Sequence, residues 1–155
     1  MNQTLQTQSA PTTLLATFYV QDTLCGLDAA TVQEVIRLGA VTRVRLGPEE
    51  VLGVINLRGR IVTLLDVGLL LGLGSAVPGR DSRIFIVEDR GEFLGLLVDR
   101  MGEVIEVDPG GGEPLPANLA TSQAKVFQCI RRSAGRVIAV LNAAELLASG
   151  SWVAK

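Results

Sequence analysis

The segment GVINLRGRIVTLLD, residues 53–66, constrains the fold more than any other part of the chain. Apolar and β-branched residues dominate both of its halves, as is typical of strands buried on one or both faces. Gly59 lies between the halves and can adopt the positive φ that a tight hairpin turn requires. Asn56, Arg58 and Arg60 surround this turn, where no packing argument requires polar side chains. The segment therefore predicts a buried β-hairpin with a polar tip.

Other apolar runs predict that most of the remaining chain is also strand. Each run is bounded by Gly, Pro, Asn, Asp or Ser residues that favour turns. The predicted strands are residues 14–20, 24–27, 41–46, 82–88, 93–98, 104–107, 126–131 and 136–141. Short helices are predicted at residues 29–35, 67–73 and 143–147, the last after a capping-box pattern that Asn142 begins. The Gly-rich segment 108–114 is predicted to be a flexible loop.

Two segments of the chain repeat each other. GRIVTLLD at residues 59–66 matches GRVIAVLN at residues 135–142, and leucines that suit a short helix follow each copy. Chance similarity between apolar strands is one explanation. We favour the other, two related five-stranded barrels packed together, because closing short strands into a barrel removes exposed edges. The Gly-, Ser- and Pro-containing segment 74–81 would link them.

The bulk composition is typical of a globular protein with a large aliphatic core. The chain has 155 residues, 48% of them hydrophobic and only 4% aromatic. Its net charge of −2 provides no general attraction to nucleic-acid phosphates or anionic lipid. No apolar run approaches the ~18–20 residues that span a bilayer, and the polar segment 1–13 lacks the features of a signal peptide. We therefore expect a soluble cytoplasmic protein.

Residue types that carry enzymatic chemistry are scarce. The chain has no histidine, and no P-loop, C-x-x-C or G-x-S-x-G motif occurs. Cys25 and Cys129 lie in apolar surroundings, which indicates buried thiols, although a single long-range disulfide is an alternative. An acidic run indicates a solvated edge rather than a calcium loop: Glu103, Glu106, Asp108 and Glu113. The sequence thus predicts a binding protein with no catalytic residues, metal site or cofactor.

The order and spacing of several motifs resemble the CheW family, the coupling proteins of bacterial chemotaxis-type signalling. The strongest motif is GVINLRG at residues 53–59. Supporting motifs are VQEV at 32–35, LG at 94–95 with VD at 98–99, and VIAVL at 137–141. The resemblance extends from about residue 14 to residue 147. It departs from the family pattern at three positions: Arg45, Thr63 and Asn142.

The resemblance implies a mostly β fold. Two fused five-stranded SH3-like β-barrels would share an apolar core, with a few short helices. We expect a disordered tail at residues 1–13 and a CheW-like domain at residues 14–147. Within that domain we expect a first barrel at about 14–73, the linker at 74–81 and a second barrel at about 82–147. Residues 148–155 would form a C-terminal tail.

The resemblance also implies a function without catalysis. Such a protein would couple the cytoplasmic tips of chemoreceptors (methyl-accepting chemotaxis proteins) to the regulatory domain of a CheA-type histidine kinase. It would be cytoplasmic and recruited to membrane-associated receptor arrays, without inserting into the membrane or binding nucleic acid. An adaptor of a pilus or gliding-motility system is the alternative within the family. A small-barrel nucleic-acid-binding protein is an alternative of another class, and Trp152, Tyr19 and the phenylalanines are not arranged for it.

Carrying the motifs over by residue gives a set of candidate receptor- or kinase-binding residues: Val32, Glu34, Asn56, Arg58, Gly95 and Val104. Val32 and Glu34 are expected on the short helix, and Arg58 at the hairpin tip. The Arg58 guanidinium could bind a receptor carboxylate through two hydrogen bonds. For Glu34 and Arg58 the alternative is a solvated surface charge. For Val32, Gly95 and Val104 it is packing or turn geometry.

Overall fold

The computed structural model describes residues 12–44, 47–115 and 126–148. Of the predicted tails 1–13 and 148–155, the structure describes only Thr12, Thr13 and Ala148. Thr13 opens the first strand and Ala148 closes the last helix. The elements are β1 (Thr13–Val20), β2 (Thr23–Asp28), the 3-10 helix η1 (Ala29–Thr31), β3 (Val32–Arg37), β4 (Thr42–Arg43), β5 (Val51–Leu57), β6 (Arg60–Asp66), α2 (Val67–Leu70), β7 (Arg83–Asp89), β8 (Glu92–Val98), β9 (Arg100–Val107), β10 (Phe127–Ser133), β11 (Arg136–Leu141) and α4 (Ala143–Ala148).

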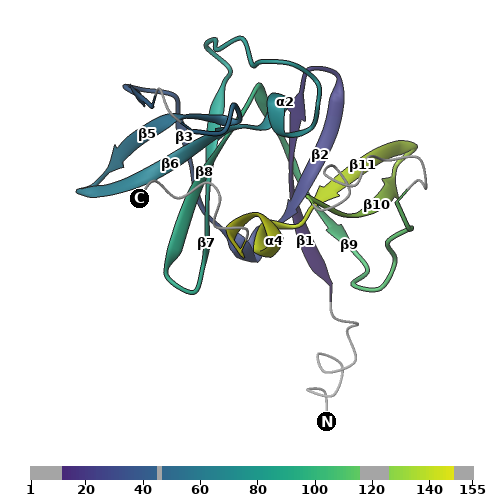
Figure 1. Cartoon of the computed structure of the whole chain (residues 1–155). Coiled ribbons are helices and arrows are strands. Elements are labelled where there is room, and N and C mark those ends of the chain that lie inside the picture. Colours follow the sequence, from purple (N-terminus) through teal and green to yellow (C-terminus); the bar gives the residue numbers. More distant parts are fainter. Residues whose placement is uncertain (1–11, 45–46, 116–125, 149–155) are drawn as a thin grey trace.

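Two sheets lie side by side, with the short helices α2 and α4 between them (Figure 1). Among the described residues, sheet A has five strands in the order β10-β11-β2-β1-β9. Sheet B has six strands in the order β3-β7-β8-β6-β5-β4. The sixth is the two-residue β4, a shorter strand than the one predicted at 41–46. The expected mostly β fold with two sheets and few helices is therefore confirmed.

The sheets do not divide the chain at residues 74–81. Sheet A combines the hairpin β1–β2, from before this segment, with β9, β10 and β11 from after it. Sheet B combines β3 to β6 with the later hairpin β7–β8. Parallel pairs join the exchanged pieces, β2 with β11 and β6 with β8. The sequential division into residues 14–73 and 82–147 thus differs from the strand pairing, since each half contributes one hairpin to the other's sheet.

The exchanged halves are related strand by strand. β6 and β11 each leave a turn with two positive φ angles, 50° and 85° at Arg58 and Gly59, 53° and 79° at Ala134 and Gly135. Each strand pairs in parallel with the second strand of an exchanged hairpin and then leads into a short helix. The helix caps are also equivalent, with Asp66 accepting a hydrogen bond from Leu69 N, and Asn142 from Glu145 N. This correspondence supports the repeat seen in the sequence.

A pair of buried glycines extends the correspondence to places where the sequence repeat was not detected. Gly26 on β2 pairs with Val140, and Gly95 on β8 pairs with Leu64. A Cβ on Gly26 would lie 3.2 Å from Ile138 Cγ2, and one on Gly95 would lie 3.0 Å from Ile84 Cγ2. Both strands therefore need glycine where a neighbouring side chain fills the interior of the sheet.

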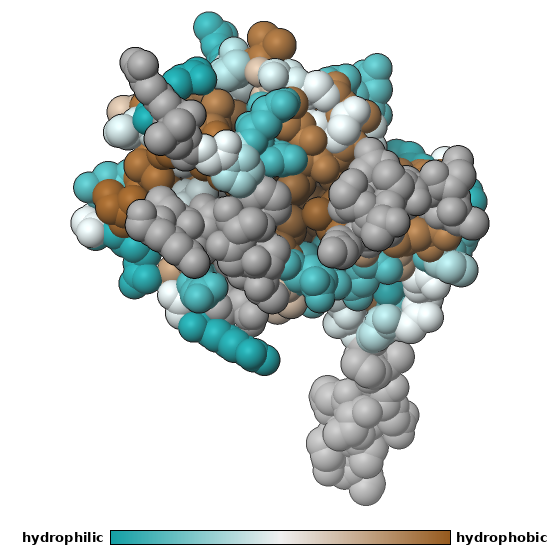
Figure 2. Space-filling view, viewed as in Figure 1, coloured by the Kyte–Doolittle hydropathy of each residue, from teal (hydrophilic) through white to brown (hydrophobic). Residues whose placement is uncertain are grey.

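The largest apolar cluster lies between the sheets rather than inside either one. Phe18 on β1 and Phe85 on β7 are fully buried there, with ring centroids 5.0 Å apart. These rings occupy equivalent strands of the two related halves. Leu15 and Ile138 belong to a separate core inside sheet A, and Leu64 to one inside sheet B. Figure 2 shows apolar side chains gathered along the seam between the sheets.

One local prediction was wrong and another was incomplete. The predicted helix at 29–35 is a single 3-10 turn followed by β3, because Val35 and Ile36 are β-branched and extend the β7 edge by pairing with Phe85 and Ile84. The segment 108–114, predicted to be a free loop, is partly fixed, since Glu113 forms a two-way backbone bridge with Ile130 at 2.7 and 2.9 Å.

The two cysteines are free thiols on opposite faces of sheet A. Cys25 lies opposite Ala139, and Cys129 lies opposite Val140. Consecutive residues of a strand point to opposite faces, so the two sulfur atoms are separated by the sheet. Burial raises the pKa of the Cys25 thiol to about 12. The alternative of a long-range disulfide between them is thus ruled out in this fold.

The exchange of hairpins predicts that neither half of the chain folds alone as a monomer. Fragments 1–77 and 78–155, expressed separately, should give poorly dispersed amide NMR spectra, because each lacks strands that complete both sheets. An equimolar mixture should restore the dispersed spectrum of the intact chain. A cooperative thermal transition and a dispersed spectrum from either monomeric fragment would contradict the exchanged pairing.

Candidate functional site

A bulge in β3 determines where Glu34 points. Val32 pairs with Val87 and Glu34 pairs with Ile86, so Gln33 is the extra residue on β3. Paired residues on neighbouring antiparallel strands share a face. Val87 belongs to the cluster between the sheets and Ile86 to the core inside sheet B. The bulge therefore directs Val32 toward the seam and Glu34 toward the end of sheet B.

Glu34 and Arg58 form an ion pair across this end of sheet B. The two guanidinium Nη atoms of Arg58 donate to the two carboxylate oxygens of Glu34, one of them at 3.3 Å. Both side chains are accessible to solvent. The hydrogen bond and the charge of Arg58 lower the pKa of Glu34, and the same contacts raise the pKa of Arg58. From the sequence we expected the Arg58 guanidinium to bind a receptor carboxylate through two hydrogen bonds. In the structure both of its Nη atoms already donate to Glu34.

The ion pair connects two strands that the backbone ladder leaves apart. β3 is one edge of sheet B, whereas the β5–β6 turn belongs to the other side of that sheet. Asn56 fixes the turn, because its Oδ1 accepts a hydrogen bond from Gly59 N at 2.8 Å. Sheet A has an equivalent contact, in which Arg136 at the start of β11 lies 3.7 Å from Glu103 on the edge strand β9. Each sheet is therefore bridged at one end by an arginine and a glutamate.

Beside the ion pair is a hollow of about 520 Å³, which we call the mouth of sheet B. Six residues line it: Gln33, Glu34, Leu57, Arg58, Arg60 and Phe93. Leu57 and Phe93 pack on the apolar core of sheet B and form its floor. The Arg60 guanidinium carbon lies 4.1 Å from the centre of the Phe93 ring, which is a cation–π contact. The mouth therefore has an apolar floor and a charged rim, an arrangement suited to binding a partner side chain.

The structure brings together only part of the predicted site. Glu34, Asn56 and Arg58 lie at or beside the mouth of sheet B. Val32 is half-buried and packs against the cluster between the sheets. Gly95 is buried on β8 below the mouth, so its position has a packing explanation.

Val104 lies on the other sheet, at the seam. It pairs with Ala16, and Met101 on the same strand pairs with Phe18, so both side chains share a face with members of the central cluster. Val104 is 51% exposed and Met101 is 43% exposed. This apolar strip on β9 is accessible for binding but is separate from the mouth of sheet B.

Three residues of the mouth were not among the predicted site residues: Gln33, Arg60 and Phe93. Gln33 is bonded to Glu88 at 3.2 Å. Arg60 was noted only as part of the polar hairpin tip, and Phe93 was predicted to be core. No local pattern links Arg60 to Phe93, because their contact depends on the parallel pairing of β6 with β8.

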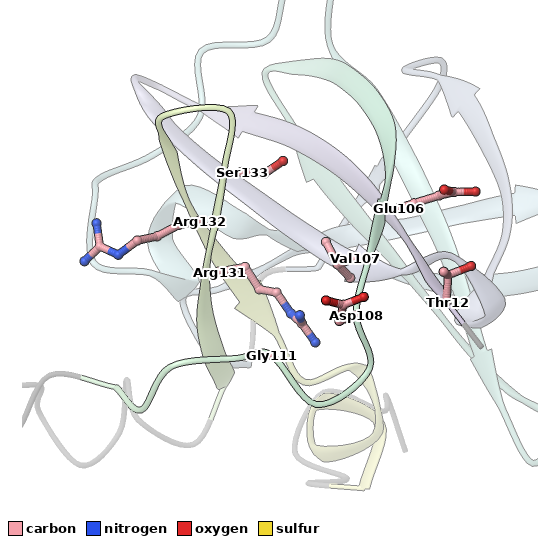
Figure 3. Close-up of a pocket in the computed structure, with 8 residues that line it drawn as sticks. All are labelled: Thr12, Glu106, Val107, Asp108, Gly111, Arg131, Arg132 and Ser133. Carbon is pink, nitrogen blue, oxygen red and sulfur yellow. The ribbon is translucent and has the colours of Figure 1, made fainter. Parts of the chain in front are cut away.

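A second hollow, of about 350 Å³, lies on sheet A where β9 ends beside β10 (Figure 3). Figure 3 shows Arg131 pointing toward the segment that contains Asp108 and Gly111, and Arg132 pointing away from it. Arg131 donates to Pro109 O at 3.1 Å, and Arg132 forms an ion pair with Glu113 at 2.8 Å. Both arginines are used in fixing segment 108–115 against β10.

The described part of the chain lacks two further features. No group of three or more His, Cys, Asp or Glu side chains in it is arranged to hold a metal ion. No helix in it is long and apolar enough to cross a membrane.

Comparison with known proteins gives consistent similarities. Residues 15–151 match the model of the CheW-like domain. The chain is 27% identical over 130 residues to the chemotaxis protein CheW of Helicobacter pylori, covering 84% of this chain and 78% of that protein. It is 29% identical over 98 residues to protein FrzA of Myxococcus xanthus, covering 63% of this chain and 61% of that protein.

A solved structure has the same fold. The crystal structure of the scaffolding protein TtCheW from Thermoanaerobacter tengcongensis superimposes with a TM-score of 0.77. The two sequences are 32% identical, and the match covers 85% of this chain and 90% of the other. The predicted pair of SH3-like subdomains is therefore confirmed.

The packing explanation for Gly95 predicts that the Gly95→Val substitution acts on stability. The added side chain would overlap Ile84 and Leu64, and such overpacking typically costs about 1–3 kcal/mol. Gly39→Val is the matched control, because nothing lies within 4 Å of a Cβ at that position. Chemical denaturation measures both variants. A Gly95→Val protein as stable as Gly39→Val would show that the packing explanation is wrong.

Proposed function

The chain belongs to the family of CheW-like domain proteins, which are non-catalytic scaffolds, and we propose that it couples chemoreceptors to a histidine kinase. In this role the protein binds the cytoplasmic tip of a methyl-accepting chemotaxis protein and the regulatory domain of a CheA-type kinase at the same time. The complex is cytoplasmic and is recruited to membrane-associated receptor arrays. No step of bond making or breaking is required of the protein.

The observation that carries the receptor-binding proposal is the charged mouth of sheet B. Its Glu34–Arg58 pair is accessible to solvent, and pairs at the surface contribute only about 0–1 kcal/mol, so its contribution to stability is small. The pair fixes the direction of two long side chains beside an apolar floor. An amphipathic helix of a receptor tip fits such a surface, with apolar residues on the floor and polar residues at the rim.

A coupling protein needs a second surface for its second partner. Among the described residues, six large apolar side chains outside the mouth are exposed: Leu14, Ile61, Val77, Met101, Val104 and Val137. We assign two of them to partners. Val104 lies at the seam, 51% exposed, and Ile61 lies on the outer face of β6, 64% exposed. We assign Val104 to the receptor side, as the family motif implies, and Ile61 to the kinase side. Separate surfaces allow both partners to bind together without competition.

The alternative functions have less support. A nucleic-acid-binding barrel requires exposed stacking aromatics on a basic face, whereas Phe18 and Phe85 are fully buried and Phe93 lies beneath Arg60. Trp152 lies outside the described residues. No observation specifically favours a pilus or gliding-motility adaptor. Thr63 and Asn142 are compatible with the fold, and Arg45 lies outside the described residues.

Co-sedimentation with a receptor cytoplasmic fragment and the kinase from the same cell tests the coupling role. The expected result is a ternary complex that contains all three proteins. Failure to form a complex with any receptor and kinase pair of that cell would overturn the proposal.

Arg58→Ala should weaken receptor binding by about 1–3 kcal/mol, as expected for a hot-spot arginine. Its free energy of unfolding should stay within about 0.5 kcal/mol of wild type, because the side chain is exposed. Loss of the guanidinium leaves the Glu34 carboxylate unpaired at the rim. Arg80→Ala, at an exposed loop position, is the control. Normal receptor binding by Arg58→Ala, or loss of its fold, would count against this role.

A further inference from the structure

Arg60 differs from Arg58 in having no carboxylate partner within the described part of the chain. The two oxygens of Glu34 are both bonded to Arg58. The carboxylate of Glu88 is also occupied, accepting hydrogen bonds from Gln33 and from Gly91 N. Within the described residues, the side chain of Arg60 lies over the ring of Phe93. The rim of the mouth therefore has one more positive than negative charge among its lining residues.

The stacking leaves the hydrogen-bonding edge of Arg60 available. The guanidinium lies over the face of the Phe93 ring, with its central carbon 4.1 Å from the ring centre. A stacked guanidinium uses its flat face for the ring, while its N–H groups point outward in its own plane. Those N–H groups match the two oxygens of a carboxylate. Phe93 packs against the core of sheet B, so the ring that supports the guanidinium is in place before any partner binds.

The related half of the molecule has the corresponding arginine paired. Arg136 follows the turn glycine of β10–β11 as Arg60 follows that of β5–β6. Arg136 reaches Glu103 on its own edge strand, at 3.7 Å. In sheet B the equivalent edge-strand glutamate, Glu34, is taken by Arg58 instead. Arg136 thus has a carboxylate partner within its own sheet, whereas Arg60 has none among the described residues.

We propose that Arg60, held on the Phe93 ring, binds an Asp or Glu side chain of the chemoreceptor tip. This inference rests on the proposed coupling function and names the acidic chemistry that the mouth selects. Arg58 then acts as a positioning residue, because it neutralises Glu34 and prevents that carboxylate from repelling the incoming acid. Arg60 is the residue that contacts the acidic side chain of the partner.

Affinity for a receptor cytoplasmic fragment, measured against salt concentration, tests the proposal. Arg60→Gln should bind about tenfold more weakly than wild type, as for a truncated hot-spot contact, and with a smaller salt dependence. Arg60→Lys keeps the charge but loses the planar fork, so it should retain the salt dependence and bind more weakly than wild type. Arg80→Gln removes the same charge from the loop before β7 and should leave affinity unchanged.

A charge exchange identifies the partner residue. Arg60→Glu should abolish binding, and changing one acidic residue of the receptor tip to Arg should restore it. If Arg60→Gln binds like wild type while Arg58→Ala is weakened, this inference is overturned and the coupling function stands. If Arg60→Gln loses kinase binding but keeps receptor binding, the assignment to the receptor is overturned. If wild type binds no receptor fragment, the coupling function itself fails.

Discussion

The packing of the two sheets against each other depends on the contact between Phe18 and Phe85. The two rings are fully buried, 5.0 Å apart, and come from the first strands of the two exchanged hairpins. Each hairpin completes the sheet of the other half, so the central cluster forms only when both halves are in place. Aromatic pairs of this kind contribute about 0.5–1.5 kcal/mol beyond the apolar area they bury. The two sheets therefore cannot move apart as independent domains.

Such an arrangement suits a scaffold, because the side chains that we propose to bind partners are presented by the paired strands of sheet B. The Glu34–Arg58 pair adds little stability in solvent, yet it connects the edge strand β3 to the β5–β6 turn. Its effect is to fix the direction of these two side chains. It holds a charged rim above the apolar floor that Leu57 and Phe93 provide. The function follows from geometry and charge, with no chemical step.

Local features were predicted from the sequence because neighbouring residues determine them. The hairpin around Arg58 and Gly59, its repeat at Ala134 and Gly135, and the Asp66 cap each depend on a few adjacent residues. The exchange of hairpins was not predicted, since apolar strands do not specify which distant strand they join. The same reason explains the error at β3. Its sequence pattern suits a helix, and it becomes a strand because it pairs with the open edge of β7.

The site was predicted in part for related reasons. Family motifs identified Glu34 and Arg58 individually, but their ion pair crosses from one side of sheet B to the other and depends on the bulge at Gln33. Arg60 was visible only as one polar residue of the hairpin tip. Its stacking on Phe93 results from the parallel pairing of β6 with β8, which α2, a long connection and β7 separate along the chain. Local sequence patterns do not specify which distant strands pair.

Amide hydrogen exchange with and without a saturating receptor fragment tests the central claim that a rigid molecule binds the receptor through one end of sheet B and through Val104 at the seam. We predict slower exchange in β3, in the β5–β6 turn and around Val104 on β9 when the receptor fragment binds. Exchange in β1 and β7, which carry Phe18 and Phe85, should remain slow and unchanged. Protection confined to the sheet A hollow around Arg131, or a change spread over β1 and β7, would contradict the account.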